Sequence, residues 1–208
     1  AAAAVRSPLL LALGVEVNGS WFPWNASWQG DAAGAAAYRL AYRHVVGLFR
    51  AEGARNVTWF FHVDAEGDPD ASWNSARAYY PGDDVVDWLG LSVYGAVDRR
   101  GPVERFPAKL RHGLADLDRA TRAKPIAIVE MGIAESPRWS KPGWIRSAFR
   151  ALAHSPRVRA VAWWHEDWPD PSGWISTRID SSRASLATYR REVAGPRYDA
   201  APRFRCVR

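Results

Sequence analysis

Cysteine and lysine are scarce in this sequence, and both scarcities exclude kinds of protein. Cys206 is the single cysteine among 208 residues, so neither an internal disulfide nor a cysteine-based metal site can form, and the redox compartment stays open. Only Lys109, Lys124 and Lys141 are lysines among 28 basic residues, and the rest are arginines spread along the chain. The net charge of +6 therefore indicates a compositional bias, and we expect no nucleic-acid partner.

Long hydrophobic runs are also missing, although the chain is apolar enough to bury a sizeable core. Hydrophobic residues make up 48% and charged residues 24% of the sequence, as in ordinary globular domains. No apolar stretch is long enough to span a bilayer, and Ala1 to Leu13 lacks the charged start and longer apolar middle of a signal peptide. We expect no membrane association, and a targeting segment only outside this sequence.

Nucleotide-binding glycine motifs are absent, while strand and helix patterns alternate. Short apolar runs predict buried strands at Leu9–Val15, Val57–Val63, Val86–Val93, Pro125–Val129 and Val158–Trp164. Helical spacing and end signals predict helices at Ala32–Glu52, Val103–Ala123, Pro142–Ala153 and Ser181–Val193. Fully apolar strands between helices favour a parallel α/β sheet, either an open doubly wound sheet or a closed (β/α)₈ barrel. No Gly-x-Gly-x-x-Gly or P-loop pattern follows a strand, which weakens the nucleotide-binding open sheet.

Tryptophan is abundant, with twelve residues, many of them in predicted loops. Exposed indole suits stacking on the apolar faces of sugar rings. The alternative for any one of these residues is simple core filling.

Two glutamates stand where catalytic groups of a parallel barrel gather. Glu16 directly follows the first predicted strand, and Glu130 ends the fourth. Side chains at these strand ends would face one another across the mouth of a barrel, as in retaining glycosidases, whose two carboxyl groups lie about 5 Å apart. The alternative is that each glutamate merely pairs with an arginine.

Four segments resemble glycoside hydrolase family 26, the β-mannanase-like family of clan A, the (β/α)₈ retaining glycosidases. Residues 16–24 (EVNGSWFPW) resemble its acid/base motif, residues 79–90 (YYPGDDVVDWLG) the approach to its sixth strand, and residues 128–132 (IVEMG) its nucleophile strand. Residues 179–182 (IDSS), with Leu186 and Tyr189, resemble the run into the last helix. The matches occur in family order and cover nearly the whole chain.

The resemblance assigns roles residue by residue. It implies that Glu16 is the acid/base and Glu130 the nucleophile, with the phenol of Tyr94 donating to the nucleophile. It also places Asn18, Trp21, Trp24 and Trp164 against substrate, with Trp163 as an alternative to Trp164. His165 and His62 end predicted strands and could touch sugar hydroxyls, and the alternative for each is a satisfied structural histidine. For Tyr94 the alternative is a structural tyrosine that caps its strand. No metal or organic cofactor is implied, and the acidic residues Asp64, Glu66, Asp68 and Asp70 are expected to form a solvated loop.

Two departures from the family pattern affect these expectations. Val15 occupies the position of a sugar-recognising histidine and cannot hydrogen-bond through its side chain, so mannan specificity is in doubt. A full barrel needs about 250 residues, and the resemblance starts at the fourth strand. We therefore expect residues 1–208 to be a single catalytic domain, incomplete at its N-terminus and holding strands 4 to 8, with an irregular tail at 195–208. Such a piece alone is predicted to be inactive or poorly soluble.

The leading hypothesis is thus a secreted, extracellular or periplasmic, retaining endo-β-glycanase that acts on a polysaccharide without an obligate protein partner. β-1,4-Mannan is favoured, with β-1,3-xylan or mixed-linkage β-glucan as alternatives. A catalytically impaired carbohydrate-binding protein is the second hypothesis, and an unrelated parallel α/β enzyme is the third.

Overall fold

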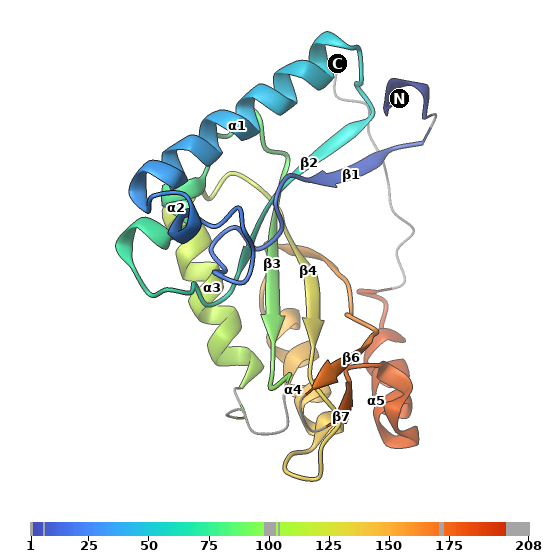
Figure 1. Cartoon of the computed structure of the whole chain (residues 1–208). Helices are drawn as coiled ribbons and strands as arrows, with labels where there is room; N and C mark the ends of the chain where they lie inside the picture. Colours follow the sequence, from blue (N-terminus) through green and yellow to red (C-terminus); the bar gives the residue numbers. More distant parts are fainter. Residues whose placement is uncertain (1, 6, 98–102, 104, 171–172, 199–208) are drawn as a thin grey trace. The chain divides into compact units, whose positions relative to one another are not determined.

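The computed structural model describes residues 2–5, 7–97, 103, 105–170 and 173–198 (Figure 1). One sheet has the strand order β1 (Leu9–Ala12), β2 (Val57–Asp64), β3 (Trp88–Tyr94), β4 (Ile126–Gly132), β5 (Val158–Val161). The helices are α1 (Ala32–Ala51), α2 (Ala76–Tyr79), α3 (Phe106–Ala120), α4 (Lys141–Ala153) and α5 (Arg183–Val193). Strands β6 (Asp167–Asp170) and β7 (Gly173–Ser176) form a separate antiparallel pair. Short 3₁₀ turns are η1 (Ala2–Ala4), η2 (Ala26–Trp28), η3 (Ser72–Asn74) and η4 (Ile179–Ser181).

The predicted alternation of strands and helices is confirmed. Strand β1 pairs in parallel with β2, and β2 pairs in parallel with β3, so each connection must cross back over the sheet. Helices fill these crossovers, and the sheet with its helices is part of a (β/α)₈ barrel. The predicted bounds of the four long helices differ from those observed by at most three residues at either end.

Three local predictions need correction. Strand β1 ends at Ala12 rather than Val15, because Gly14 has φ 66° and turns the backbone out of the extended conformation. Strand β5 ends at Val161 rather than Trp164. The β6–β7 pair was not predicted, since Pro169 within β6 is typical of a turn rather than of a strand.

The chain divides into two compact units, each with its own core. Among the described residues, the first comprises those up to Ser92 together with His112–Ala127, and the second comprises Val93–Arg111 together with residues 128–198. The division passes through β3, α3 and β4. No helix within the described residues is long and apolar enough to cross a membrane.

Aromatic side chains build the core of the first unit. Helix α1 places Tyr38, Tyr42 and Val46 four residues apart, so all three lie on one face, and all three are buried. The ring of Tyr42 packs edge-on against Trp59 of β2, with centroids 5.9 Å apart. This contact holds α1 against β2, and the loop of Glu16 is hydrogen-bonded to the same strand.

The second unit is built around the aromatic residues of α4. Trp144 packs edge-on against Phe106 at 5.2 Å and against Trp163 at 5.9 Å, and Phe149 packs against Tyr189 of α5 at 5.7 Å. Helix α4 starts at a Ser140 cap that accepts the backbone N–H of Gly143. The predicted irregular tail lies outside the described residues from position 199 onward.

Candidate active site

Glu16 lies on an irregular loop after β1, and this loop is attached to β2. Its backbone has φ 45°, in the left-handed region that costs a residue with a Cβ roughly 1 kcal/mol or more. The backbone N–H of Val17 donates to the carbonyl of His62 at 3.1 Å, which fixes the loop to the adjacent strand. Glu16 as a whole residue is only 7% exposed, and Oε2 of its carboxyl group accepts the indole N–H of Trp21 at 2.7 Å.

Asn18 fixes this loop to Asp64 at the end of β2. Its side-chain Nδ2 donates to the carbonyl of Asp64 at 2.9 Å, and its Oδ1 accepts the backbone N–H of Asp64 at 2.8 Å. The residue is 1% exposed, so its side chain has almost no surface with which to touch a sugar. Asn18 therefore positions the loop of Glu16, and a substrate contact of this residue stays a prediction.

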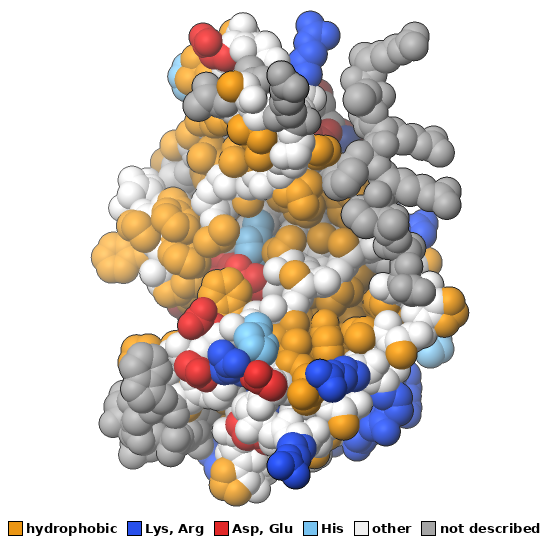
Figure 2. All heavy atoms as spheres, turned by 90° about the vertical axis from the view of Figure 1, so that its right-hand side faces the viewer, with side chains coloured by type: hydrophobic (Ala, Val, Ile, Leu, Met, Phe, Trp, Pro, Cys, Tyr) orange, Lys and Arg blue, Asp and Glu red, His pale blue; other side chains and the backbone are white. Residues whose placement is uncertain are grey.

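Three exposed tryptophans surround the loop, each with its N–H bonded internally. Trp21, Trp24 and Trp28 are 52%, 37% and 68% exposed. The indole N–H of Trp24 donates to the carbonyl of Val15 at 2.8 Å, and that of Trp28 donates to the carbonyl of Ser20 at 2.7 Å. The polar edges are thus satisfied while the rings stay partly exposed, and one face of Trp24 is stacked on Phe22 with centroids 4.5 Å apart. Figure 2 shows hydrophobic side chains reaching the surface on one face of the molecule.

His62 does not end its strand and does not reach the surface. It lies within β2, two residues before Asp64, is 3% exposed, and its Nε2 is 2.7 Å from the hydroxyl of Ser92. Burial lowers the pKa of His62 to about 3, because the imidazolium would lose its hydration. This burial fits the structural alternative for His62, whose backbone carbonyl accepts the N–H of Val17 on the loop of Glu16.

The acidic loop after β2 is structural. Asp64 accepts the backbone N–H of Glu66 at 2.8 Å, and Asp68 accepts the hydroxyl of Ser20. Within the described residues no cluster of three or more His, Cys, Asp or Glu side chains is placed to hold a metal ion.

Glu130 is held by a regular strand. It lies within β4, which continues to Gly132, so the strand extends three residues beyond the predicted end at Val129. The backbone N–H of Gly95 donates to the carbonyl of Gly132 at 2.8 Å and keeps this end of β4 in a regular ladder. The hydroxyl of Tyr94, the last residue of β3, donates to Oε2 of Glu130 at 2.8 Å. This contact is the one that the family resemblance implies, and a hydrogen bond of this kind stabilises the ionised carboxylate.

An aromatic series continues from Tyr94. Its ring lies 6.1 Å from that of Trp168 on β6, which lies 6.1 Å from that of Trp164. Trp164 is 37% exposed, whereas Trp163 packs against Trp144 and donates its indole N–H to the carbonyl of Thr177. The pair therefore divides into one exposed and one core residue, as alternation along an extended segment predicts. Sequence reasoning missed Trp168, although a tryptophan closely following the last predicted strand was a usable signal.

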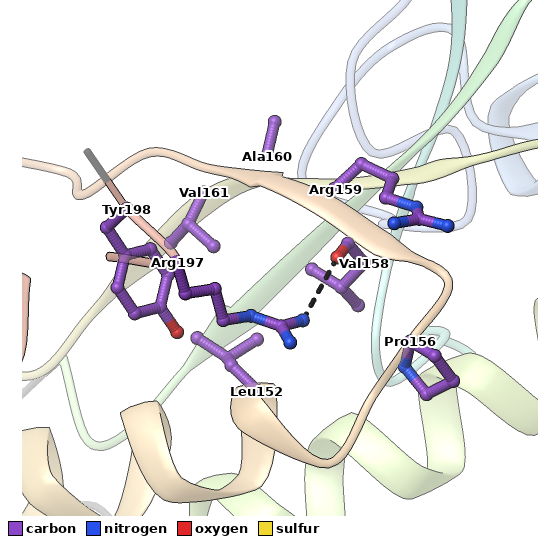
Figure 3. A pocket seen from close by; sticks show the side chains of 8 residues that line it. All are labelled: Leu152, Pro156, Val158, Arg159, Ala160, Val161, Arg197 and Tyr198. Carbon is purple, nitrogen blue, oxygen red and sulfur yellow. Dashed lines mark hydrogen bonds between the residues drawn. The ribbon is translucent and has the colours of Figure 1, made fainter. Parts of the chain in front are cut away.

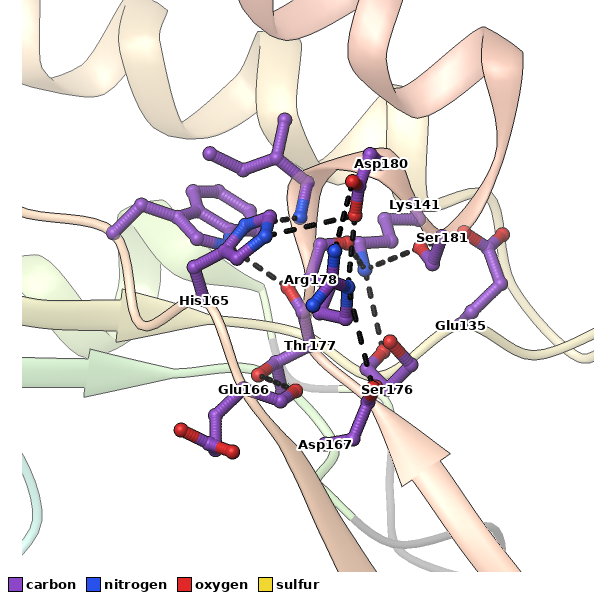
Figure 4. A network of polar contacts seen from close by, with 12 residues as sticks. Glu135, Lys141, His165, Glu166, Asp167, Ser176, Thr177, Arg178, Asp180 and Ser181 are labelled. Carbon is purple, nitrogen blue, oxygen red and sulfur yellow. Dashed lines mark hydrogen bonds and ion pairs between the residues drawn. The ribbon is translucent and has the colours of Figure 1, made fainter.

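A buried lysine ties the segment after β7 to the start of α4 (Figure 4). Lys141 is fully buried, and its Nζ donates to the carbonyl of Arg178 at 2.6 Å and to the hydroxyl of Ser181 at 2.8 Å. Burial lowers its pKa to about 8, against the opposing effect of Glu135 and two aspartates nearby. His165, predicted to bind substrate, is exposed and accepts the backbone N–H of Ile179 at 3.1 Å. A role for His165 toward sugar stays a prediction.

A hollow of about 250 Å³ lies beside β5 in the second unit (Figure 3). It is lined by Val158, Ala160 and Val161 of the strand, Leu152 and Pro156, with Arg159, Arg197 and Tyr198. Arg197 donates to the carbonyl of Val158 at 3.4 Å. The hollow contains no carboxylate, so it lacks the acid–base pair on which the sequence prediction rests.

Taken together, each unit offers one glutamate with a fixed donor and neighbouring aromatic rings. An ionised carboxylate that accepts a phenol is suited to nucleophilic attack, and a largely buried carboxyl beside an exposed indole is suited to proton transfer at a sugar. A parallel α/β sheet that carries such groups after its strands has the features of the (β/α)₈ glycoside-hydrolase class.

Comparison with known proteins defines the family. The model of glycosyl hydrolase family 26 matches residues 3–109, just over half of the chain, and the chain belongs to this family. The sequence is 32% identical over 185 residues to endoglucanase H of Acetivibrio thermocellus, covering 86% of this chain and 19% of that protein. It is 31% identical over 133 residues to a mannan endo-1,4-beta-mannosidase of Thermothelomyces thermophilus, covering 64% and 22%.

Solved structures support the fold. GH26C from a Muricauda species superposes with a TM-score of 0.68 at 22% identity, covering 94% of this chain and 51% of that one. The chain thus spans about half of this solved chain and about a fifth of the curated relatives above.

Proposed function

We propose that this chain supplies the catalytic glutamates of a retaining endo-β-glycanase. The observation that carries the proposal is the 2.8 Å hydrogen bond from Tyr94 to Glu130, together with the 2.7 Å bond from Trp21 to Glu16. The two glutamates are those assigned by the family motifs, and each is oriented by a specific donor. Family membership supports the reaction class, and a glycan-degrading enzyme is proposed to act outside the cell or in a periplasm.

In the first step, an oxygen of Glu130 attacks the anomeric carbon while the bond to the leaving oxygen breaks. Glu16, protonated, gives its proton to that oxygen, and a glycosyl ester on Glu130 results. In the second step Glu16 takes a proton from water, the water oxygen attacks the anomeric carbon, and the carboxylate of Glu130 leaves. This double displacement requires the two carboxyl groups to be about 5 Å apart.

The proposed substrate is β-1,4-mannan. Two relatives bear the name mannan endo-1,4-beta-mannosidase, at 31% identity each. A β-glucan is the second candidate, because the relative named endoglucanase H matches 86% of this chain against 64% and 58% for the two mannosidases. Val15 in place of the family's histidine also favours a changed sugar beside the scissile bond.

The test is the release of reducing ends from mannan and from mixed-linkage β-glucan by the whole protein, with its Glu130→Ala variant measured beside the wild type. We expect release from at least one glycan, and loss of that release in the variant. Glu52→Ala, which changes an exposed glutamate after α1, is the matched control and should be as active as the wild type. Affinity for glycan without release in any of the proteins would instead support a carbohydrate-binding protein.

A further inference from the structure

Trp28 is the most exposed of the aromatic side chains around the loop of Glu16, and no role has been assigned to it. It ends the short turn η2 (Ala26–Trp28) and is 68% exposed. Complete exposure of an indole leaves a large apolar surface in water, and a freely rotating indole would also present no fixed face. The use of this ring in binding therefore depends on whether the ring is mobile or held in place.

The backbone that carries Trp28 is firmly anchored. Asn25, the cap of η2, is fully buried, and its side chain accepts the backbone N–H of Ser27 and donates to the carbonyl of Val17 at 2.9 Å. Ala26 is also fully buried, and its N–H donates to the hydroxyl of Tyr79 at 3.0 Å. The turn is thus fixed to the core of the first unit just before Trp28.

The ring is anchored at its other end too. The indole N–H donates to the carbonyl of Ser20 at 2.7 Å. Ser20 is itself tied down, because its hydroxyl donates to Asp68 and the neighbouring Gly19 bridges to Asp68. With its polar edge bonded and its backbone fixed, Trp28 presents a preformed apolar face to solvent. Ordering such a ring on binding costs little entropy.

Trp28 is also connected to the candidate acid/base. Its acceptor Ser20 precedes Trp21, whose indole donates to Glu16. Because Glu16 would protonate the leaving oxygen, rings on this segment adjoin the leaving-group part of a bound glycan. Pyranose rings of a β-linked chain have apolar C–H faces that stack on indole.

We propose that Trp28 is a stacking platform for a pyranose ring in the leaving-group part of a β-linked glycan, beyond the sugar next to Trp21. This inference rests on the proposed function, since it assumes that Glu16 serves the leaving group. It adds a binding position for long chains that the two catalytic carboxylates do not need.

The test is calorimetric binding of β-1,4-linked mannose and glucose oligosaccharides of two and six units to the whole protein. We expect Trp28→Ala to raise the Kd of the bound hexasaccharide about tenfold, the effect of losing one buried apolar face, and to leave the Kd of the disaccharide unchanged. Trp28→Phe keeps a flat ring without the bond to Ser20 and should fall between. Leu40→Ala removes an exposed side chain of α1, 70% exposed, and should bind as the wild type does.

Two outcomes separate this inference from the proposed function. If the wild type binds a hexasaccharide, and Trp28→Ala and Trp28→Phe both bind it as tightly as the wild type does, the platform is refuted while the proposed function stands. If the wild type binds none of the oligosaccharides, the platform is refuted, whereas the proposed function is judged separately by the release of reducing ends. Thermal unfolding of each variant, compared with the wild type, shows whether an altered Kd reflects the lost ring or a lost fold.

Discussion

Glu16 sits on a loop whose backbone has left the sheet, whereas Glu130 is a member of a regular strand. The loop holds Glu16 at φ 45°, a conformation that L-residues rarely adopt, and it depends on side-chain bonds from Asn18 and Trp21. The strand holds Glu130 through backbone pairing, and one phenol from the adjacent strand orients the carboxyl group.

The difference fits the separate demands of the two proposed roles. A nucleophile must reach one carbon from a fixed direction, and a strand fixes direction without strain. An acid/base must be reached by the leaving oxygen and then by water, and a loop beside exposed indoles gives access to both. Side-chain contacts therefore set much of the geometry around Glu16, whereas backbone pairing sets the geometry around Glu130.

The largest expected effect is a loss of kcat that depends on the leaving group for Glu16 but not for Glu130. Glu130→Ala should lower kcat by about 10⁴-fold or more on both polysaccharide and a dinitrophenyl β-glycoside, since no nucleophile remains. Glu16→Ala should lose about 10²- to 10⁴-fold on polysaccharide, yet it should release dinitrophenol in a rapid burst, because that leaving group needs no proton. Stopped-flow absorbance measures the burst. Equal losses on both substrates for both variants would break the assignment of different roles.

A second effect concerns the loss of folding stability at acid pH that His62, on the strand next to the loop of Glu16, should cause. Because the pKa of His62 is lowered to about 3, the unfolded chain binds more protons than the folded chain between about pH 6.5 and 3. The stability of the native state is therefore full above pH 6.5 and falls as pH drops through this window, by about 3 kcal/mol from pH 7 to pH 4.

This loss should be much smaller in His62→Gln, measured by urea unfolding at pH 7, 5 and 4. His154→Gln changes an exposed histidine after α4 and is the matched control. An acid dependence of His62→Gln equal to that of the wild type would show that His62 is not the group responsible.

A third effect tests the donor on Glu130. Tyr94→Phe removes only the phenol oxygen that bonds Glu130 at 2.8 Å. A hydrogen bond to a charged group is worth about 1.5 to 3 kcal/mol, so we expect kcat to fall by about 10- to 100-fold with little change in KM. Tyr80→Phe removes a phenol that bonds the carboxylate of Asp83 at 2.6 Å and should leave kcat unchanged. Equal kcat values for Tyr94→Phe and the wild type would contradict the orienting role.

Sequence patterns predicted the regular parts of the molecule well. Apolar runs located all five strands of the sheet, and helical spacing such as that of Tyr38 and Tyr42 located the long helices. Such patterns reflect burial along one local segment, which a sequence displays directly. The end of β1 was missed because a left-handed turn at Gly14 interrupts an apolar run without changing its composition.

The candidate site was predictable only in part. The motif around Glu16 and the strand of Glu130 carry local signals, and the resemblance added Tyr94. Lys141 was missed because its partners lie 35 to 40 residues further along the chain, and no local pattern displays such contacts. The burial of Asn18 was missed for the same reason, since it depends on packing against another strand and loop.

The smallest predicted effect tests the comparison at the backbone itself. At φ 45° alanine keeps the strain of a left-handed residue while glycine does not, so Glu16→Gly should be about 1 kcal/mol more stable than Glu16→Ala. Within β4 glycine only adds disorder to the unfolded chain, so Glu130→Gly should be about 0.5 to 1 kcal/mol less stable than Glu130→Ala. Urea midpoints at pH 7 give both differences, and each pair lacks the carboxyl group, so lost activity does not enter. Opposite signs would show that backbone strain is specific to the loop; the same sign at both positions would mean that the fold holds the two glutamates alike.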